Sequence, residues 1–145
     1  MRDRAARLLS ILLLSLAVMA CGRAEAGSPE AVADAFSNAY FRLADQEAAK
    51  RYTAFGATKM LDKELADVRA VRKDGFSAGE SKLQVSLERG ARSERGHRVR
   101  FQYTLSYQDG AMIKYADVEL SKVHGDWKVV RVGLSDKPPP ATSAP

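Results

Sequence analysis

The alternation of apolar and polar residues on both sides of one turn constrains this chain the most. From Val99 to Tyr107 every second residue is apolar or aromatic, as in a strand with one buried face. Asp109-Gly110 follows, a dipeptide typical of two-residue hairpin turns. A one-residue slip would turn a strand's apolar side chains to solvent, so the register is well specified. The turn predicts these cross-strand pairs: Tyr107–Met112, Leu105–Lys114, Tyr103–Ala116, Phe101–Val118, Val99–Leu120 and, on the other face, Arg100–Glu119.

The same reasoning predicts a hairpin on each side of the first one. A three-residue loop at 124–126 gives the pairs Leu120–Val130, Val118–Val132, Ala116–Leu134 and Glu119–Arg131. A loop from Gly90 to Gly96 gives the pairs Leu87–Val99, Val85–Phe101, Leu83–Tyr103 and Glu88–Arg98. All of these turns place the apolar residues on one side. We therefore expect a four-stranded antiparallel meander with one buried face.

Residues before the strands have helical periodicity. Ser28-Pro29-Glu30 combines an N-cap, a first-turn proline and an acid near the positive end of the helix dipole. Apolar residues then recur at helical spacing in three segments: Val32, Phe36, Ala39, Tyr40 and Leu43; Ala48, Tyr52 and Phe55 after a cap at Asp45; and Leu61, Leu65 and Val68 within 58–72. The sequence thus predicts an α+β fold, with two or three N-terminal helices packed on a curved four-stranded antiparallel meander.

The segment 1–20 has the features of a secretion signal. Arg2, Arg4 and Arg7 precede an almost wholly apolar run that extends from Leu8 to Ala20. A helix needs about 20 apolar residues to span a bilayer, so this run is too short for a transmembrane helix. A basic start, a short apolar run and a small final residue are typical of signal peptides. No later stretch of the sequence is apolar enough to span a membrane.

The single cysteine follows this run directly. Val18-Met19-Ala20-Cys21 resembles the bacterial lipobox, in which the cysteine is acylated and becomes the mature N-terminus. The resemblance implies a cell-envelope lipoprotein, anchored in the membrane by several acyl chains, palmitate among them, on Cys21. Gly22 follows in place of Asp, which implies the outer membrane, facing the periplasm, in a Gram-negative host. The alternative is ordinary signal cleavage near Ala24 or Ala26, which would remove the cysteine.

The chain divides into a signal peptide (1–20), a tether (21–27), a domain (28–135) and a Pro-rich tail (136–145) that we expect to be disordered. The signal peptide holds three of the 23 basic and one of the 18 acidic residues, which leaves a net charge of +3 for the remainder. This excess is too small to suggest a nucleic-acid partner.

A resemblance to a known superfamily fits this layout. Helices, then strands, then a last strand that begins Gly125-Asp126-Trp127-Lys128-Val129 look like the nuclear transport factor 2-like, or cystatin-like, superfamily, and especially its small bacterial lipoproteins. The resemblance covers about residues 28–135. It implies a sheet that wraps around the first helix as a cone. Such a cone holds a ligand, an active site or only a core, so the fold does not supply the function.

The residues favour binding over catalysis. His97 and His124 are the only histidines and lack the spacing of metal ligands, so we expect no metal and no cofactor. No serine lies in a nucleophile motif. The inward strand positions carry no Asp, Glu or His, which leaves acid–base chemistry without a titratable group. We therefore predict no catalytic residues and expect that the protein is not an enzyme.

One candidate ligand pocket remains, with two local alternatives. It combines inward-facing residues: Tyr40, Tyr103, Tyr107, Met112 and Lys114. The alternative is that the tyrosines belong to the core and Lys114 reaches out to solvent. Arginines crowd the first predicted loop, at positions 89, 92, 95, 98 and 100. A solvated loop is the favoured interpretation of these charges, and contact with anionic headgroups or an acidic partner is the alternative.

Three functions follow as hypotheses. The first is a non-enzymatic, membrane-anchored lipoprotein that binds an envelope protein or supports an envelope assembly. The second is binding of a small apolar ligand in the cone, and the third is a cone-type isomerase or dehydratase. A filled core with exposed apolar side chains favours the first, and an enclosed pocket lined by Tyr103 and Tyr107 favours the second. A buried carboxylate beside Tyr103 favours the third.

Overall fold

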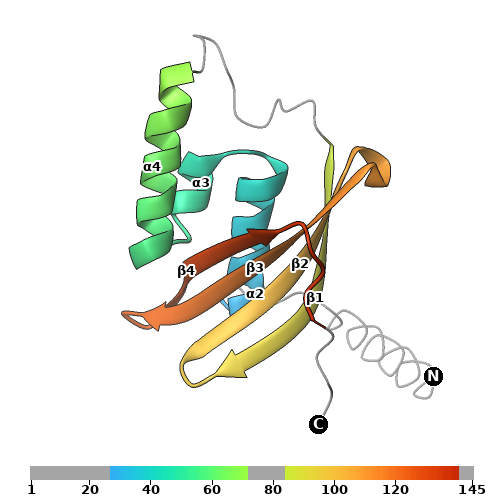
Figure 1. The fold of residues 1–145 in the computed structure, drawn as a ribbon. Coiled ribbons are helices and arrows are strands. Elements are labelled where there is room, and N and C mark those ends of the chain that lie inside the picture. The colour runs from blue at the N-terminus through green and yellow to red at the C-terminus, as the bar shows by residue number, and fades with distance from the viewer. Residues whose placement is uncertain (1–26, 72–83, 141–145) are drawn as a thin grey trace, which may run out of the picture.

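A computed structural model describes residues 27–71 and 84–140 and has an α+β architecture (Figure 1). Cys21 and Leu83 lie outside the described residues. The helical elements are α2 (Pro29–Ser37), η1 (Asn38–Arg42), α3 (Gln46–Lys50) and α4 (Phe55–Val71). The strands β1 (Val85–Arg95), β2 (Arg98–Tyr107), β3 (Met112–Val123) and β4 (Asp126–Ser135) form one antiparallel sheet in the order β1-β2-β3-β4, as predicted, and η2 (Gln108–Gly110) is a short turn.

The first helix begins where the sequence predicts. Ser28 is the N-cap of α2, its Oγ accepts a hydrogen bond from the backbone N–H of Ala31 at 3.1 Å, and Pro29 occupies the first turn. The helix continues into η1, a turn of π-helix. Phe36 and Ala39 are buried, whereas Leu43, which we expected on the same apolar face, is 37% exposed.

The second helix is shorter than predicted. Asp45 caps α3 and accepts a hydrogen bond from the N–H of Ala48 at 2.9 Å. The helix ends at Lys50, because the next residues pair with the edge of the sheet instead: the backbone of Tyr52 and Ala54 forms two hydrogen bonds of 2.9 Å with Val129 of β4. The expected apolar face of Ala48, Tyr52 and Phe55 therefore does not form, and Phe55 starts α4 with 67% exposure.

The central hairpin has the predicted register. All six predicted pairs occur between β2 and β3, from Tyr107–Met112 to Val99–Leu120. Asp109 and Gly110 have φ angles of 56° and 95°, a left-handed conformation that glycine adopts at no steric cost. The alternation along β2 thus specifies both the buried face and the pairing.

The next hairpin confirms part of its predicted register and corrects the rest. Ala116–Leu134, Val118–Val132 and Glu119–Arg131 pair as expected. Leu120, however, pairs with Val129 and not Val130, and the turn has two residues, His124 and Gly125, both at positive φ. Asp126, which we assigned to the loop, is the first residue of β4 and pairs with Val123, whereas Val130 is the extra residue in a β-bulge opposite the step from Glu119 to Leu120. The bulge turns Val129 into the core, where it is fully buried.

The predicted register of the first hairpin is wrong. The chain has no long loop at 90–96, because β1 continues to Arg95 and turns tightly at Gly96-His97. Val85 pairs with Tyr107 and Leu87 with Leu105, six residues from the predicted partners, and Glu88 pairs with Thr104. The displacement is an even number of residues, so Val85 and Leu87 still face inward. A bulge between Arg89 and Arg92 interrupts the ladder.

The core fills the space between the sheet and the helices. In Figure 1, α2 lies behind the sheet, and α4 stands beside β4. We call the face of the sheet toward α2 the inner face and the opposite face the outer face. Side chains with less than 2% exposure come from both layers: Phe36, Leu61, Phe101, Leu105, Val118, Leu120 and Val129. Burial of this apolar surface is the main stabilising term of the fold.

Candidate functional site

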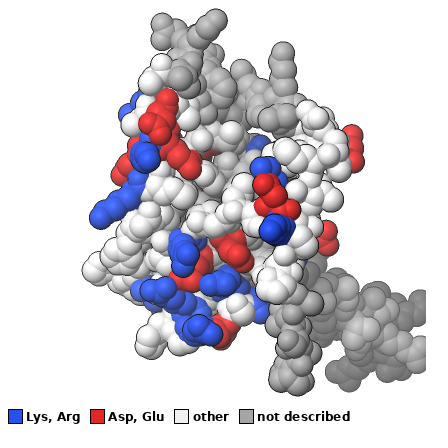
Figure 2. Space-filling model, viewed as in Figure 1, with Lys and Arg blue, Asp and Glu red and all other residues white. Residues whose placement is uncertain are grey.

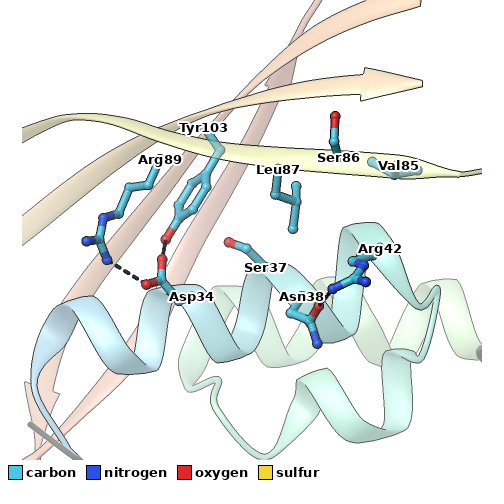
Figure 3. Close-up of a pocket in the computed structure, with 9 residues that line it drawn as sticks. All are labelled: Asp34, Ser37, Asn38, Arg42, Val85, Ser86, Leu87, Arg89 and Tyr103. Atoms are coloured by element: carbon cyan, nitrogen blue, oxygen red, sulfur yellow. Dashed lines mark hydrogen bonds and ion pairs between the residues drawn. The ribbon is translucent and has the colours of Figure 1, made fainter. Parts of the chain in front are cut away.

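A polar pocket of about 510 Å³ lies between α2 and the first two strands (Figure 3). The helix supplies one wall, and β1 and β2 supply the other. Its lining combines charged, hydroxyl and apolar side chains: Asp34, Ser37, Asn38, Arg42, Val85, Ser86, Leu87, Arg89 and Tyr103. Ala33 and Ser37 are fully buried, and such small residues let a helix approach a sheet closely.

Asp34 joins the helix to both strands. Its Oδ1 accepts a hydrogen bond from the Tyr103 hydroxyl at 2.7 Å, and its Oδ2 forms an ion pair with Arg89 Nη1 at 2.6 Å (Figure 3). The side chain of Asp34 is 48% exposed and that of Arg89 is 35% exposed. Both carboxylate oxygens are therefore engaged at the mouth of the pocket, while water still reaches the pair.

Two tyrosines have altered acidity. Burial, and then the hydrogen bond to Asp34, raises the pKa of Tyr103 well above the ordinary tyrosine value. Burial, and then the hydrogen bond to Glu64, raises the pKa of Tyr40 in the same way. Both hydroxyls therefore stay protonated at physiological pH and act as hydrogen-bond donors.

The side-chain hydroxyl of Ser37 is buried and accepts or donates no hydrogen bond given above. Its side chain has no exposed surface, and its Oγ has no hydrogen-bond partner among the described residues. In Figure 3 the hydroxyl points into the pocket, toward Tyr103. A buried hydroxyl without a hydrogen bond lowers the stability of the fold. A ligand with a polar group at this position would form the missing hydrogen bond.

The structure separates the residues of the candidate ligand pocket. Tyr103 alone of the five lines the pocket of Figure 3. The Tyr40 hydroxyl instead bonds Glu64 of α4 at 2.7 Å, and its ring stacks on Phe36. Tyr107 is partly buried and packs against the core, and its cross-strand neighbour Met112 is 45% exposed.

Lys114 has an acidic partner at the end of the sheet. It faces Leu105 across the hairpin, as expected, and its Nζ lies 3.0 Å from Oδ1 of Asp136. The Asp136 side chain is 82% exposed, so the pair lies at the surface. This geometry is that of a lysine that reaches out to solvent.

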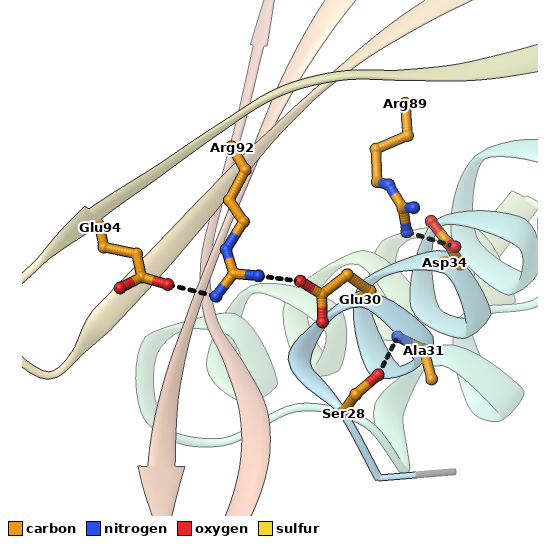
Figure 4. A network of polar contacts seen from close by, with 7 residues as sticks. All are labelled: Ser28, Glu30, Ala31, Asp34, Arg89, Arg92 and Glu94. Atoms are coloured by element: carbon orange, nitrogen blue, oxygen red, sulfur yellow. Dashed lines mark hydrogen bonds and ion pairs between the residues drawn. The ribbon is translucent and has the colours of Figure 1, made fainter. Parts of the chain in front are cut away.

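The arginines of the predicted loop lie on strands. The bulge in β1 puts both Arg89 and Arg92 on the inner face, where each guanidinium carbon lies within 6 Å of the Phe101 ring centre (5.7 and 5.9 Å). Arg92 forms ion pairs with Glu30 in the first turn of α2 and with Glu94 (Figure 4). Two of the five arginines are therefore bound to the helix and do not belong to a solvated loop.

Sequence reasoning missed Asp34 and Ser37 because it searched the strands for carboxylates, and it placed Arg89 in a loop although this residue lies in β1. Glu30 and Asp34 are four residues apart and share one helix face. Arg89 continues the inward alternation of Val85 and Leu87. Together these two spacings could have predicted an acidic helix face opposite basic residues of β1.

The pocket has a tyrosine beside a carboxylate, Tyr103 and Asp34. Both carboxylate oxygens of Asp34 already have a partner, the Tyr103 hydroxyl on one and Arg89 on the other. Asp34 is also half exposed, whereas our criterion for an enzyme was a buried carboxylate. Within 27–71 and 84–140, no group of three or more His, Cys, Asp or Glu side chains is placed to hold a metal ion. In the same ranges, no helix is long and apolar enough to cross a membrane.

Compared with known proteins, the chain matches no family model, and no curated protein or solved structure is significantly similar to it.

Proposed function

We propose that the protein is a non-enzymatic lipoprotein of the bacterial cell envelope, anchored through lipid on Cys21, whose domain binds a protein partner or supports an envelope assembly. We place it in the outer membrane, facing the periplasm, if the host is Gram-negative. We also propose that its helices and sheet form a nuclear transport factor 2-like cone. The order of helices followed by a meander supports this assignment.

The distance along the chain between Cys21 and the first helix carries the proposal. Ser28 caps α2, so the folded domain begins seven residues after the cysteine. A lipid anchor needs only a short segment of chain between the acylated cysteine and the folded domain. Acylation also explains why a protein of an oxidising compartment has a single cysteine. A signal that ends at Ala20 leaves α2 and its cap complete.

Two structural features support partner binding. The inner face is filled around Phe101 and Leu105, which are almost fully buried. Met112 and Leu134, whose register positions also lie on the inner face, are 45% and 53% exposed. A protein partner would bury such apolar side chains. At Asp34, both carboxylate oxygens bind protein groups, which favours a structural or binding role over proton transfer.

Crosslinking in intact cells tests the proposal. A photoreactive residue at position 112 or 134 is expected to give one discrete adduct with an envelope protein. The same residue at Ala66, an exposed position on α4, is the control and is expected to give none. Cys21→Ser should abolish the adduct, because it removes the anchor. Equal labelling at all three positions, or no adduct at any, would contradict a partner at this end of the sheet.

A small ligand in the pocket of Figure 3 is the second candidate function. The buried, unpartnered Ser37 hydroxyl favours it, and Val85 and Leu87 offer an apolar wall. Because the rest of the lining is largely polar, a ligand with a hydrogen-bonding group fits this pocket better than a wholly apolar one. Ligand-dependent stabilisation that is lost in Ser37→Ala would establish this function.

A further inference from the structure

We propose that four arginines on the outer face of the sheet bind the anionic headgroups of the membrane in which the protein is anchored. We call them the outer arginine patch: Arg95, Arg98, Arg100 and Arg131. This inference rests on the proposed anchor at Cys21 and adds an orientation for the domain on the membrane.

The patch has more positive charge than its surroundings neutralise. Arg98 and Arg100 lie 2.7 and 3.6 Å from the two oxygens of one carboxylate, Glu119, whose side chain is only 10% exposed. Arg131 pairs with Glu119 in the strand register, and neither Arg131 nor Arg95 has an ion-pair partner in the described part of the chain. Glu94 lies beside the patch and forms an ion pair with Arg92.

The end of the first hairpin brings like charges together. Arg95 and Arg98 are direct cross-strand partners, an arrangement that repulsion destabilises unless an anion lies near. A hollow of about 480 Å³ is lined by the four arginines together with Ser93 and two acids, Glu94 and Glu119. Figure 2, which looks onto the outer face, shows basic side chains gathered over the lower part of the sheet with acidic ones between them. Phosphate groups fit arginine because guanidinium donates paired hydrogen bonds to them.

The tether holds this patch close to the proposed anchor. Glu30, in the first turn of α2, binds Arg92, so the start of the domain lies beside the end of the first hairpin (Figure 4). Seven residues of chain from Cys21 to Ser28 reach at most about 25 Å when fully extended. The outer arginine patch therefore stays near the bilayer surface, where each arginine gains about 1 kcal/mol from anionic lipid.

A fluorescence experiment on the lipidated full chain tests this orientation. Cys21 is the only native cysteine, and acylation blocks its thiol, so one introduced cysteine is labelled uniquely. His97→Cys places the label at the end of the first hairpin, and Asp109→Cys places it at the opposite end of β2. The protein is reconstituted in vesicles of phosphatidylcholine, or of phosphatidylcholine with phosphatidylglycerol, and headgroup-bound nitroxides quench the label.

We expect quenching at position 97, but not at 109, to increase with phosphatidylglycerol and to disappear in 1 M salt, where the Debye length is about 3 Å. Arg95→Gln with Arg131→Gln breaks no ion pair given above and should lower the ratio of docked to undocked protein about five-fold for each charge removed. Lys63→Gln removes one positive charge from α4, beyond the first turns of that helix, which line a hollow with Arg98 and Arg131, and should have no effect.

Equal quenching of position 97 in both kinds of vesicle would overturn the inference, and so would an equal loss in the lysine control. If an acidic protein binds the outer arginine patch in neutral vesicles and changes the fluorescence of the label at position 97, the patch has a protein partner. That result would also overturn the inference. Failure of the anchor gives a separate result: the protein would wash off all vesicles, and Cys21 would itself accept the label.

Discussion

The Tyr103 hydroxyl donates a hydrogen bond to Asp34 Oδ1 at 2.7 Å and so joins β2 to α2, which lies 69 residues earlier in the chain. The other carboxylate oxygen holds Arg89 of β1. One helical residue thus connects two neighbouring strands at the edge of the pocket in Figure 3.

Removing the Tyr103 hydroxyl should weaken the fold modestly. Tyr103→Phe deletes one hydrogen bond to a charged acceptor but leaves the buried ring in place, so we expect a loss of about 1–2 kcal/mol in the free energy of unfolding. Urea denaturation measures it. Tyr115→Phe, at a partly buried position of β3 without a hydroxyl hydrogen bond given above, is the control. Equal stability of the Tyr103 variant and the parent would show that the bond contributes nothing.

Alkaline titration should distinguish Tyr40 and Tyr103 from the other tyrosines of the chain. Their pKa values are raised by burial and by their carboxylate partners, and the unfolded chain titrates near 10. Above pH 10 the native state keeps protons that the unfolded state loses, so stability falls as the pH rises through this range. Ultraviolet absorbance of tyrosinate is expected to include a late component that decreases in Tyr40→Phe and in Tyr103→Phe. A titration unchanged by either substitution would contradict the assignment.

Ser37→Ala tests whether the pocket normally holds a polar group. In the protein alone, the change removes an unsatisfied buried oxygen and should raise the free energy of unfolding by up to about 1 kcal/mol. Ser86 lines the same pocket but is exposed. Ser86→Ala should therefore leave the free energy of unfolding within about 0.5 kcal/mol of the parent value. Thermal denaturation compares the two variants. A clear loss of stability in Ser37→Ala would instead show that this hydroxyl has a hydrogen-bond partner, either Tyr103 or a bound molecule.

Lys114→Met should leave the fold as stable as the parent or more stable. The lysine pairs with Asp136 at the surface, where such pairs contribute about 0–1 kcal/mol, and methionine would pack beside Leu105. Asp136→Asn breaks the same pair and keeps the lysine, which separates the two contributions. If the methionine variant loses stability and the asparagine variant does not, Lys114 has a role that this pair does not explain.

The sequence predicted best where a local signal and a burial pattern agreed. Asp109-Gly110 and the alternation along β2 gave the correct register of the central hairpin, and Ser28 and Asp45 gave two correct helix caps. The first hairpin was wrong by six residues because residues assigned to a loop continue β1, and the last hairpin was wrong by one residue near its turn because Val130 forms a bulge in β4. A bulge changes which residues face the core without changing composition, so periodicity alone does not locate it.

The site was harder to predict than the fold, because it depends on contacts between distant segments. Tyr103 was expected on the inner face and lies there. Its partner Asp34 comes from a helix that contacts the sheet at a position that no local pattern specifies. The early end of α3 was missed for a related reason: the backbone of Tyr52 and Ala54 bonds the edge of β4, a pairing that the side-chain pattern does not encode.

The mass of the mature N-terminus tests the central claim most directly. Intact-mass and peptide spectrometry of protein from native membranes should find a chain that begins at Cys21, with the added mass of its acyl chains, and no peptide from the segment 1–20. Cys21→Ser should lack this mass and leave the membrane fraction. A mature chain that begins after Cys21, or one that retains the segment 1–20, would contradict the account.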